Sequence, residues 1–533
     1  MTSDARRADW RFLLPMPDSQ PFAHMVLLGG PPGLAALLRA LGVALDISRS
    51  VPPGRTADAV VVLHDSPIAP HRAALALAGG GVFYAEVDRR TARGLLETPR
   101  RLCRRLRAAR LRPSALYWVV PHFDDARRFV PLDSAGALDW YFDAAWRQLS
   151  YARMAAARLA RLWMRGNSAR FGSVAPCYSV VAVEDSVSTT IPAVLTDLTL
   201  KSHLIDSGAS FALVTSGQDD GSRVVMLPFG RGEAPRAAIK VSRLPAFNGH
   251  TTREHRRLLR LRSQLSADLR PTLPRPYQAS SWHGLAVAVE SFAPGPSMAA
   301  STGYRGATAA QQIDDLRAAT EWLARVHSQW QVSEAAWTDS EIDRWVEGPC
   351  RDYARTFGFD IRTDRLFTDT YGHAQQLRGK RCPIVLQHDD FGPWNVHRSD
   401  QGLTVIDWEA DGEVPQGGAP ALQDLIYFVT HWFFVAMRAH SRSSRRHAYE
   451  RLVASNPGSD IAIAAARAAV DSYMRALRID PAFLRVLTVV TWVRHAVARH
   501  LRDQSSPVEH NQYVDYVKTL AVYAHVLFDD AIE

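Results

Sequence analysis

The chain has 533 residues, of which 47% are hydrophobic and 22% are charged, and its formal net charge is +9. This composition is typical of a soluble globular protein with two or three domains. The four cysteines lie far apart without a C-x-x-C pair, which argues against a disulfide framework or a zinc site. The first residues lack the continuous apolar segment of a secretory signal, so we expect a cytoplasmic protein.

The N-terminal third alternates predicted strands with predicted helices. A helix is predicted at residues 33–42, and strands are predicted at residues 24–30, 43–46, 57–63, 81–87 and 114–120. Such alternation predicts βαβ units around a mostly parallel sheet. We therefore expect an α/β, Rossmann-like domain over residues 1–165.

A glycine-rich turn follows the first predicted strand, where Rossmann-like folds bind nucleotides. Gly29, Gly30 and Gly33 enclose two prolines, and Asp46 ends the second strand, where an acid often holds a ribose. The pattern resembles a degenerate class I, S-adenosylmethionine-dependent methyltransferase, but it departs from the usual Gly-x-Gly-x-Gly. We favour a non-catalytic structural or docking domain. An active methyltransferase and an unrelated α/β domain remain alternatives.

An arginine-rich segment occupies residues 100–112. One interpretation is peripheral contact with anionic lipid or another polyanion. The alternative, which we favour, is the solvated face of a helix that covers the sheet with Leu102, Leu106 and Leu111 turned inward. No base-stacking aromatics accompany the arginines, so nucleic acid is not an expected partner.

Residues 166–200 begin with a turn-rich stretch and are predicted to be a linker. The next segment, 201–295, resembles the smaller lobe of a kinase. A predicted strand, a tight loop with Gly217 and Gly221, and a second strand suit a loop that covers the ATP phosphates. An ordinary hairpin turn explains the same pattern equally well.

The third strand of this segment contains Lys240, in an Ala-Ile-Lys pattern typical of the phosphate-binding lysine strand of kinases. A lysine of this kind is held by an acid on the next helix. Glu254 is the only acid between Lys240 and Asp268, so it is the expected partner. The alternative for Glu254 is a first-turn glutamate favoured by the helix dipole.

Residues 384–409 carry the motif on which the functional prediction depends. Two short apolar runs enclose a polar loop, and the chain here contains His388, Asp390, Asn395 and, at the end of the second run, Asp407. The spacing H-x-D-x-x-x-x-N, followed by an aspartate, is that of a phosphoryl-transfer loop. Asp390 would accept the proton of a substrate hydroxyl, while Asn395 and Asp407 supply the oxygen ligands that Mg²⁺ prefers. A polar hairpin turn is the alternative.

This stretch resembles the aminoglycoside phosphotransferase and choline kinase family, whose members are relatives of the protein kinases. The family signature is matched at residues 388–395, 406–409 and 424–425, except that Asp389 replaces the usual glycine. The resemblance covers residues 202–428. It implies a bilobal, α+β, protein-kinase-like fold whose helical C-lobe we assign to residues 296–533.

The resemblance also implies roles for residues that take no direct part in the chemical step. In this family the position of His388 is structural, and that of Asp424 usually anchors the loop. The apolar strand with Glu290 and Phe292 is similar to the hinge whose backbone contacts adenine.

We therefore predict a Mg²⁺-dependent enzyme that transfers the γ-phosphate of ATP to a hydroxyl of a small molecule. The family's acceptors make an amino sugar, a sugar or glycolipid, or an amino alcohol the expected substrate. One alternative is a pseudokinase scaffold or regulatory protein without turnover. Another is an S-adenosylmethionine-dependent methyltransferase with an accessory kinase-like domain.

Overall fold

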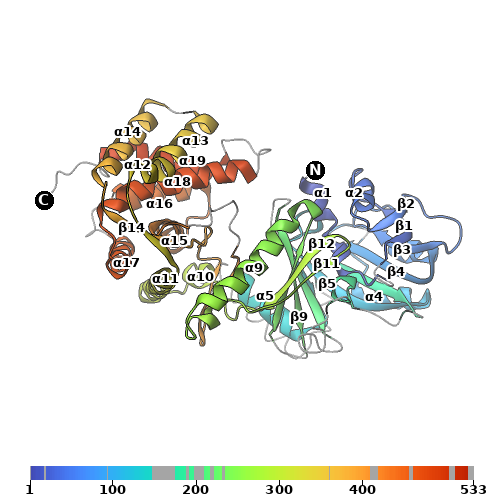
Figure 1. Cartoon of the computed structure of the whole chain (residues 1–533). Helices are drawn as coiled ribbons and strands as arrows, with labels where there is room; N and C mark the ends of the chain where they lie inside the picture. The colour runs from blue at the N-terminus through green and yellow to red at the C-terminus, as the bar shows by residue number, and fades with distance from the viewer. Residues whose placement is uncertain are drawn as a thin grey trace. The chain divides into compact units, whose positions relative to one another are not determined.

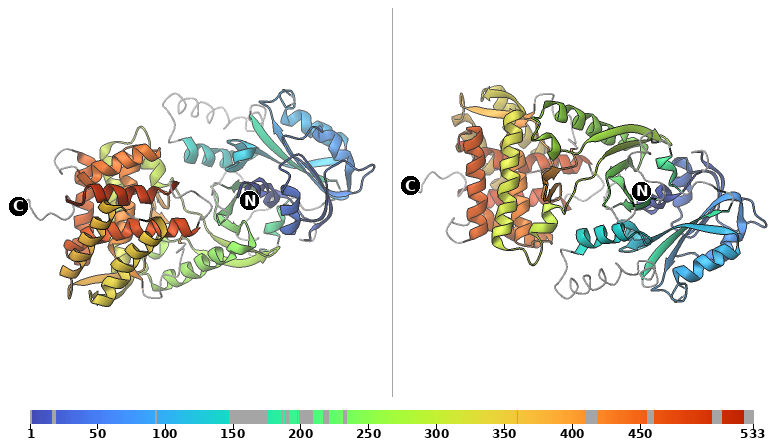
Figure 2. Two further views of the ribbon diagram at one scale, coloured as in Figure 1. Left: turned by 90° about the horizontal axis from the view of Figure 1, so that it is seen from above. Right: turned by 90° about the horizontal axis from the view of Figure 1, so that it is seen from below.

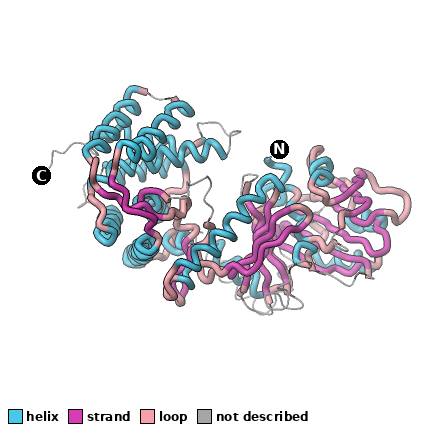
Figure 3. Tube along the Cα trace, viewed as in Figure 1, coloured by secondary structure: helices cyan, strands magenta, loops and turns pink. Residues whose placement is uncertain are grey.

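The computed structural model describes residues 2–16, 20–92, 94–146, 175–185, 187, 191–196, 198, 209–215, 221–230, 234–358, 360–408, 418–454, 460–502 and 510–525 (Figure 1). The chain divides into two compact units. Unit 1 consists of Met1–Trp146, Tyr151–Arg256 and Arg275–Phe292, and unit 2 consists of Arg147–Ser150, Arg257–Pro274 and Ala293–Glu533. Strands dominate unit 1, whereas helices dominate unit 2 (Figure 3).

Unit 1 is built on a sheet of 12 strands among the described residues. Its first part is parallel, in the order β4-β3-β1-β2, and these strands are Phe22–Leu28 (β1), Ala44–Ser48 (β2), Ala57–Val62 (β3) and Leu77–Asp88 (β4). Parallel strands covered on both faces read as continuous apolar runs. β3 shows this, because Ala59 and Val61 enter one apolar core while Val60 and Val62 enter another.

The sheet continues from β4 through antiparallel strands in the order β7-β5-β6-β8-β9-β10-β12-β11. These strands are Leu111–Val120 (β5), Arg128–Pro131 (β6), Cys177–Glu184 (β7), Ser210–Val214 (β8), Arg223–Phe229 (β9), Ala237–Ser242 (β10), Pro276–Trp282 (β11) and Leu285–Ser291 (β12). β7 therefore forms an interior strand within the range we predicted as a linker. The pairing of β6 with β8 places strands of the predicted 1–165 and 201–295 domains in one sheet. The separate Rossmann-like domain and the domain bounds stay predictions.

The start of the chain packs against the end of β10 through buried charges. The segment Asp9–Leu13 (η1) is a short 3₁₀ helix. Arg243 donates from Nε and Nη2 to the carboxylate of Asp9 at 3.0–3.2 Å, and Arg11 donates to the carbonyl of Arg243 at 2.6 Å. Removing one partner of such a buried pair leaves an uncompensated charge. These contacts join the first residues to a strand more than 200 residues later within unit 1.

The helices of unit 1 are Thr2–Arg7 (α1), Leu34–Ala40 (α2), Pro70–Ala73 (α3), Pro99–Ala108 (α4) and Ala135–Trp146 (α5), and Asn248–Gln264 (α9) begins in this unit. In α4, Leu102 and Leu106 are buried, and Arg105 forms an ion pair with Glu97 at 2.6 Å. Leu102 and Leu106 therefore face inward as the favoured interpretation expected, whereas Leu111 lies beyond the end of the helix and is buried as the first residue of β5. Contact of this helix with anionic lipid stays a prediction.

Unit 2 is mainly helical, as expected for the C-lobe assigned to residues 296–533. Its helices are Met298–Thr302 (α10), Ala309–Gln329 (α11), Asp339–Ile342 (α12), Gly348–Phe357 (α13), Ile361–Gln376 (α14), Leu422–Ala436 (α15), Arg442–Ala454 (α16), Ile461–Leu477 (α17), Ala482–Arg502 (α18) and Gln512–Val522 (α19). α18 and α19 pack side by side (Figure 2). In the described part of the chain, none of the helices combines the length and apolar character that a membrane crossing requires.

Two small β elements of unit 2 carry the predicted loop. One is a three-stranded antiparallel sheet of Gln331–Ala336 (β13), Arg381–Val385 (β14) and Ala419–Pro420 (β17). The other is a hairpin of Val396–Ser399 (β15) and Gly402–Val405 (β16). Since β14 leads into the loop and the hairpin leads out of it, both ends of the loop are fixed by strand pairing.

Candidate active site

The predicted catalytic loop lies between β14 and the β15–β16 hairpin. Gly392 donates its backbone N–H to the carbonyl of Asp390 at 2.7 Å, which closes a tight turn inside the loop. Ile406 donates to the carbonyl of Asn395 at 2.9 Å. Because this bond joins the end of the hairpin to the loop, Asp407, which follows Ile406, lies close to Asp390.

The carboxylate of Asp424, in the first turn of α15, anchors the start of the loop. It accepts the backbone N–H groups of His388 at 2.6 Å and of Asp389 at 3.0 Å. His327 Nε2 lies 3.6 Å from the same carboxylate, and Asp424 itself donates its backbone N–H to Gln387. Burial alone would raise the pKa of Asp424, but the hydrogen bond and charge of His327 and the backbone donor of His388 hold it below the usual range. The anchor is therefore a buried carboxylate whose charge is compensated by donors.

The ring of His388 is fully enclosed and fixed in one tautomer. Nε2 donates to the carbonyl of Ile406 at 2.9 Å, and Nδ1 accepts the backbone N–H of Asp390 at 3.3 Å. Burial lowers the pKa of His388. A neutral imidazole thus bridges the loop to the end of the hairpin, and its two nitrogens are used in holding the backbone.

The carboxylate of Asp390 is the centre of the site. Asn395 Nδ2 donates to its Oδ2 at 3.0 Å, Tyr427 donates to its Oδ1 at 2.8 Å, and Trp394 Nε1 donates to Oδ2 at 3.3 Å. Burial, together with the negative charge of Asp407, raises the pKa of Asp390 to about 6. A carboxylate with this pKa is ionised near neutral pH and is more basic than an exposed one, which suits a general base.

Asn395 and Asp407 form a donor set that fits a divalent cation. Both hydrogens of the Asn395 amide are used, because Nδ2 also donates to the backbone carbonyl of Asp390 at 2.9 Å. The amide oxygen is therefore the atom left to serve as a ligand, and Asp407 contributes a carboxylate oxygen. Hard oxygen donors suit Mg²⁺, and a cation here would relieve the repulsion between Asp390 and Asp407.

The backbone explains the one departure from the family signature. Asp389 has a φ of 67°, in the left-handed region that glycine adopts most readily. Asp and Asn are the side chains that tolerate this region best, because their short polar groups bond locally. The aspartate can therefore occupy the usual glycine position without changing the course of the loop.

In unit 1, Lys240 lies within a buried cluster of charges. Its Nζ is 2.6 Å from Glu254 Oε1 and 2.8 Å from Glu290 Oε1. Arg223 forms an ion pair with the other oxygen of Glu254. Burial and the neighbouring Glu254 raise the pKa of Glu290 above its usual range. The expected Lys240–Glu254 pair is present, and the structure adds Glu290 and Arg223 to it.

The remaining predicted nucleotide-binding positions are only partly described. Gly221 lies at the start of the segment before β9, whereas Gly217 and residues 409–417 lie outside the described residues. Phe292 donates its backbone N–H to the carbonyl of Arg236 at 3.1 Å. The backbone N–H of Phe292, which belongs to the predicted hinge, is therefore already hydrogen-bonded within unit 1.

The glycine-rich turn of the N-terminal third is closed by the chain itself. Gly30 donates its backbone N–H to both carboxylate oxygens of Asp65, at 2.8 and 3.0 Å. Asp46 has a side chain that is 70% exposed and lies 3.9 Å from His24. The backbone donor of Gly30 is therefore engaged by Asp65, whereas Asp46 stays largely exposed.

Sequence reasoning missed Tyr427 and Tyr513. Tyr427 lies three residues after Asp424, so the same face of α15 that anchors the loop also presents a hydroxyl to Asp390. That spacing is the signal that could have identified it. Tyr513, which contacts the Tyr427 hydroxyl at 3.1 Å, comes from α19 and has no such local signal.

A pair of substitutions tests the conformation at Asp389. Glycine adopts a φ of 67° without strain, whereas a β-branched side chain pays about 1–2 kcal/mol there. We expect Asp389→Val to unfold about 2 °C or more below Asp389→Gly in a thermal melt. Both variants lack the aspartate, so their difference isolates the backbone effect. Equal melting temperatures would contradict a left-handed conformation at this position.

Residues 202–459 match the model of the phosphotransferase enzyme family. No curated protein sequence matches. Among solved structures, the chain is similar to a glucosamine kinase in complex with glucosamine, ADP and inorganic phosphate, with 18% identity over 60% of this chain and 80% of that chain and a TM-score of 0.37.

Two further structures are similar at comparable levels. An amicoumacin kinase in complex with AMP-PNP, Ca²⁺ and Ami shares 13% identity over 61% of this chain and 91% of that chain, with a TM-score of 0.34. A choline/ethanolamine kinase family protein from Mesorhizobium loti shares 14% identity over 56% of this chain and 97% of that chain, with a TM-score of 0.30. The family match confirms the resemblance that the loop motif indicated. Residues 202–459 of this chain are thus similar to the phosphotransferase enzyme family.

Proposed function

We propose that the protein transfers the γ-phosphate of ATP to a hydroxyl group of a small molecule. The observation that supports this most strongly is the environment of Asp390. Its carboxylate is held by Asn395, Tyr427 and Trp394, and the nearby charge of Asp407 raises its pKa. A basic carboxylate beside a set of oxygen ligands is the arrangement that phosphoryl transfer to an alcohol requires.

Asp390 acts as the general base in this proposal. It accepts the proton of the acceptor hydroxyl as that oxygen attacks the γ-phosphorus, while the bond to the β-phosphate oxygen breaks and ADP leaves. Tyr427 and Asn395 donate to the two carboxylate oxygens and so keep the base in one orientation. Positioning of this kind supplies a large part of the catalysis, because phosphoryl transfer needs little covalent help from the protein.

Asn395 and Asp407 would hold Mg²⁺, which when bound neutralises charge on the transferred phosphate. We propose that Lys240 binds the α- and β-phosphates and that Glu254 orients it. Lys240 is enclosed by two carboxylates at 2.6 and 2.8 Å, so its side chain has a defined position before nucleotide binds. Such preorganisation lowers the cost of ordering a long lysine side chain.

The acceptor is proposed as a class rather than a compound: an amino sugar, a sugar or glycolipid, or an amino alcohol. The family match supports a small-molecule acceptor. A non-catalytic scaffold is the weaker proposal, because a scaffold would have no need of a buried carboxylate with a raised pKa. A methyltransferase site at the N-terminal turn is also weaker, since Asp65 occupies the backbone donor of Gly30.

Replacing the proposed base gives the first test. Asp390→Asn keeps the shape of the side chain but cannot accept the proton, so we expect kcat to fall by about 10²–10⁴-fold. The measurement is ADP release in the presence of a panel of amino sugars, sugars and amino alcohols. Asp400→Asn is the matched control, because Asp400 lies exposed in the turn of the adjoining hairpin. Full activity of Asp390→Asn would refute the assignment of the base.

The pH dependence of kcat/KM tests the origin of the raised pKa. Because only the ionised carboxylate is a base, the rate should fall about tenfold per pH unit below about pH 6. The Tyr427 hydrogen bond stabilises the ionised form, so Tyr427→Phe should raise the pKa further and move this acidic limb to higher pH. Tyr516→Phe serves as the control, since the Tyr516 hydroxyl has no hydrogen-bond partner among the described residues. If the acidic limb of kcat/KM stays at the same pH in Tyr427→Phe, the ionisation of Asp390 does not control the rate.

A further inference from the structure

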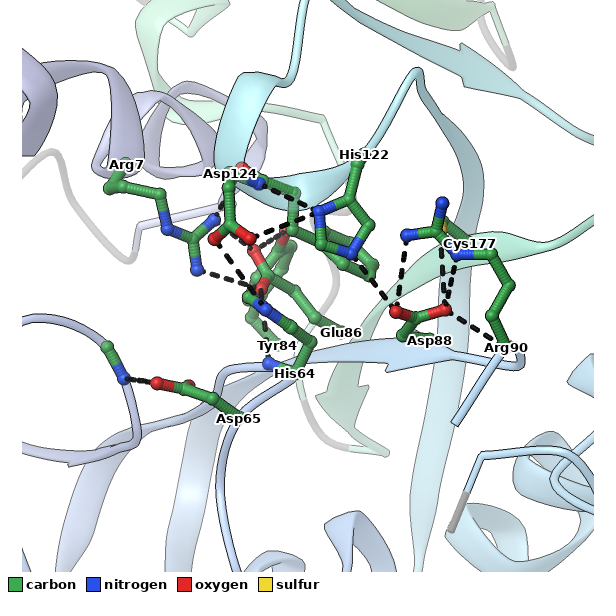
Figure 4. Close-up of polar contacts among 12 residues, drawn as sticks. Arg7, His64, Asp65, Tyr84, Glu86, Asp88, Arg90, His122, Asp124 and Cys177 are labelled. Carbon is green, nitrogen blue, oxygen red and sulfur yellow. Dashed lines mark hydrogen bonds and ion pairs between the residues drawn. The ribbon is translucent and has the colours of Figure 1, made fainter. Parts of the chain in front are cut away.

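The parallel part of the unit 1 sheet carries a second group of polar side chains, remote in sequence from the kinase motifs. His64 follows the end of β3, and Glu86 and Asp88 lie at the end of β4. These three line a cavity of about 550 Å³. After β5, His122 caps the short 3₁₀ helix Phe123–Asp125 (η4), and Asp124 lies within that helix (Figure 4). The carboxyl ends of parallel strands are where open α/β sheets bind ligands.

Each histidine of this group is oriented by its own carboxylate. His64 Nδ1 lies 3.2 Å from Glu86 Oε2, and His122 Nε2 lies 3.0 Å from Asp88 Oδ2 (Figure 4). Glu86 is buried and also accepts from Arg7 at 3.1 and 3.3 Å. An ionised carboxylate only accepts, so these two ring nitrogens are the ones that carry hydrogen.

The opposite ring nitrogens converge on one carboxylate. His64 Nε2 lies 3.6 Å from Asp124 Oδ1, and His122 Nδ1 lies 3.2 Å from Asp124 Oδ2. The three ligand atoms lie within 4.8 Å of one another. Ligands about 2.0–2.1 Å from a tetrahedral ion are about 3.3 Å apart, so each imidazole lies about a ligand separation from one of the two Asp124 oxygens. His122 Nδ1 also accepts the backbone N–H of Asp124 at 3.4 Å, which is consistent with a lone pair on that atom.

We propose that His64, His122 and Asp124 bind a divalent transition-metal ion of the Zn²⁺ type, with Glu86 and Asp88 orienting the two imidazoles. Imidazole and carboxylate are the donors that such ions take, and a histidine ligand almost always donates its other N–H to a carboxylate or carbonyl. Three protein ligands leave at least one coordination position for water or for an oxygen of a ligand. His64 also lines the cavity, so a molecule bound there would lie beside this position.

The neighbouring group of Asp88, His122 and Cys177 is a weaker candidate. Asp88 is already bound by the guanidinium of Arg90 at 3.0 and 3.3 Å. The buried Cys177 thiol also donates to Asp88 Oδ1 at 3.6 Å, so both groups are engaged within the protein. The measured contacts therefore assign Asp88 to orientation of His122 rather than to the metal.

The test is metal binding by the full-length protein after treatment with a chelator. Titration with Zn²⁺ followed by calorimetry, and with Co²⁺ followed by its visible absorption, should show one site that persists in Asp407→Ala. This last variant removes the proposed kinase ligand, so it separates the two metal sites. Asp124→Asn should bind at least about tenfold more weakly, as should His122→Ala. The side chain of Asp124 is 67% exposed, so its substitution is expected to leave the fold intact.

Two controls make the result decisive. His71→Ala alters a histidine that lines the same cavity without joining the proposed ligands, and it should bind as the original protein does. Asp88→Asn keeps the three ligands but weakens the orientation of His122, which should cost about 10–100-fold in affinity. Binding unchanged in Asp124→Asn, or loss in His71→Ala equal to that in His122→Ala, would overturn the proposal. Absence of any site that persists in Asp407→Ala would overturn it as well.

Discussion

The candidate active site depends on one interaction, the acceptance of two successive backbone N–H groups by the buried carboxylate of Asp424. These bonds fix His388 and Asp389 at the start of the loop. The same helix presents Tyr427 to Asp390. A buried carboxylate is stable only where donors compensate its desolvation, so the loop and helix α15 each need the other. The chemistry proposed for Asp390 follows from this mutual support.

The sequence indicated candidate residues for the loop because the chemistry of such a site restricts residue types and spacing, and their roles stay predictions. It could not predict their supports. Tyr513 reaches the Tyr427 hydroxyl from α19, and Arg223 reaches Glu254 from β9. Contacts of this kind depend on tertiary packing, which leaves no periodic signal in the chain. The left-handed backbone at Asp389 could be inferred only indirectly. The family signature has a glycine at this position, and glycine adopts this conformation most readily.

In the fold, too, features set by neighbouring residues could be predicted, whereas contacts between distant segments could not. The alternating strands of the N-terminal third were predictable, because buried parallel strands such as β3 read as apolar runs. The interior position of β7 and its pairing with β4 and β5 were not, because pairing partners are chosen over long sequence separations. The pairing of β6 with β8 is a further example. It places the strand of Lys240 and the strands of the N-terminal third in one sheet.

The central claim is that this chain binds a nucleotide together with a divalent cation through Asp407. A thermal melt of the purified protein with ATP and Mg²⁺, with ATP alone, and with Asp407→Ala in both conditions tests it most directly. A ligand at 100 times its dissociation constant adds about 2.7 kcal/mol of stability, which raises the melting temperature by a few degrees. The account predicts stabilisation by ATP that requires Mg²⁺ and is lost in Asp407→Ala. An unchanged melting temperature with ATP and Mg²⁺, or equal stabilisation in Asp407→Ala, would contradict it.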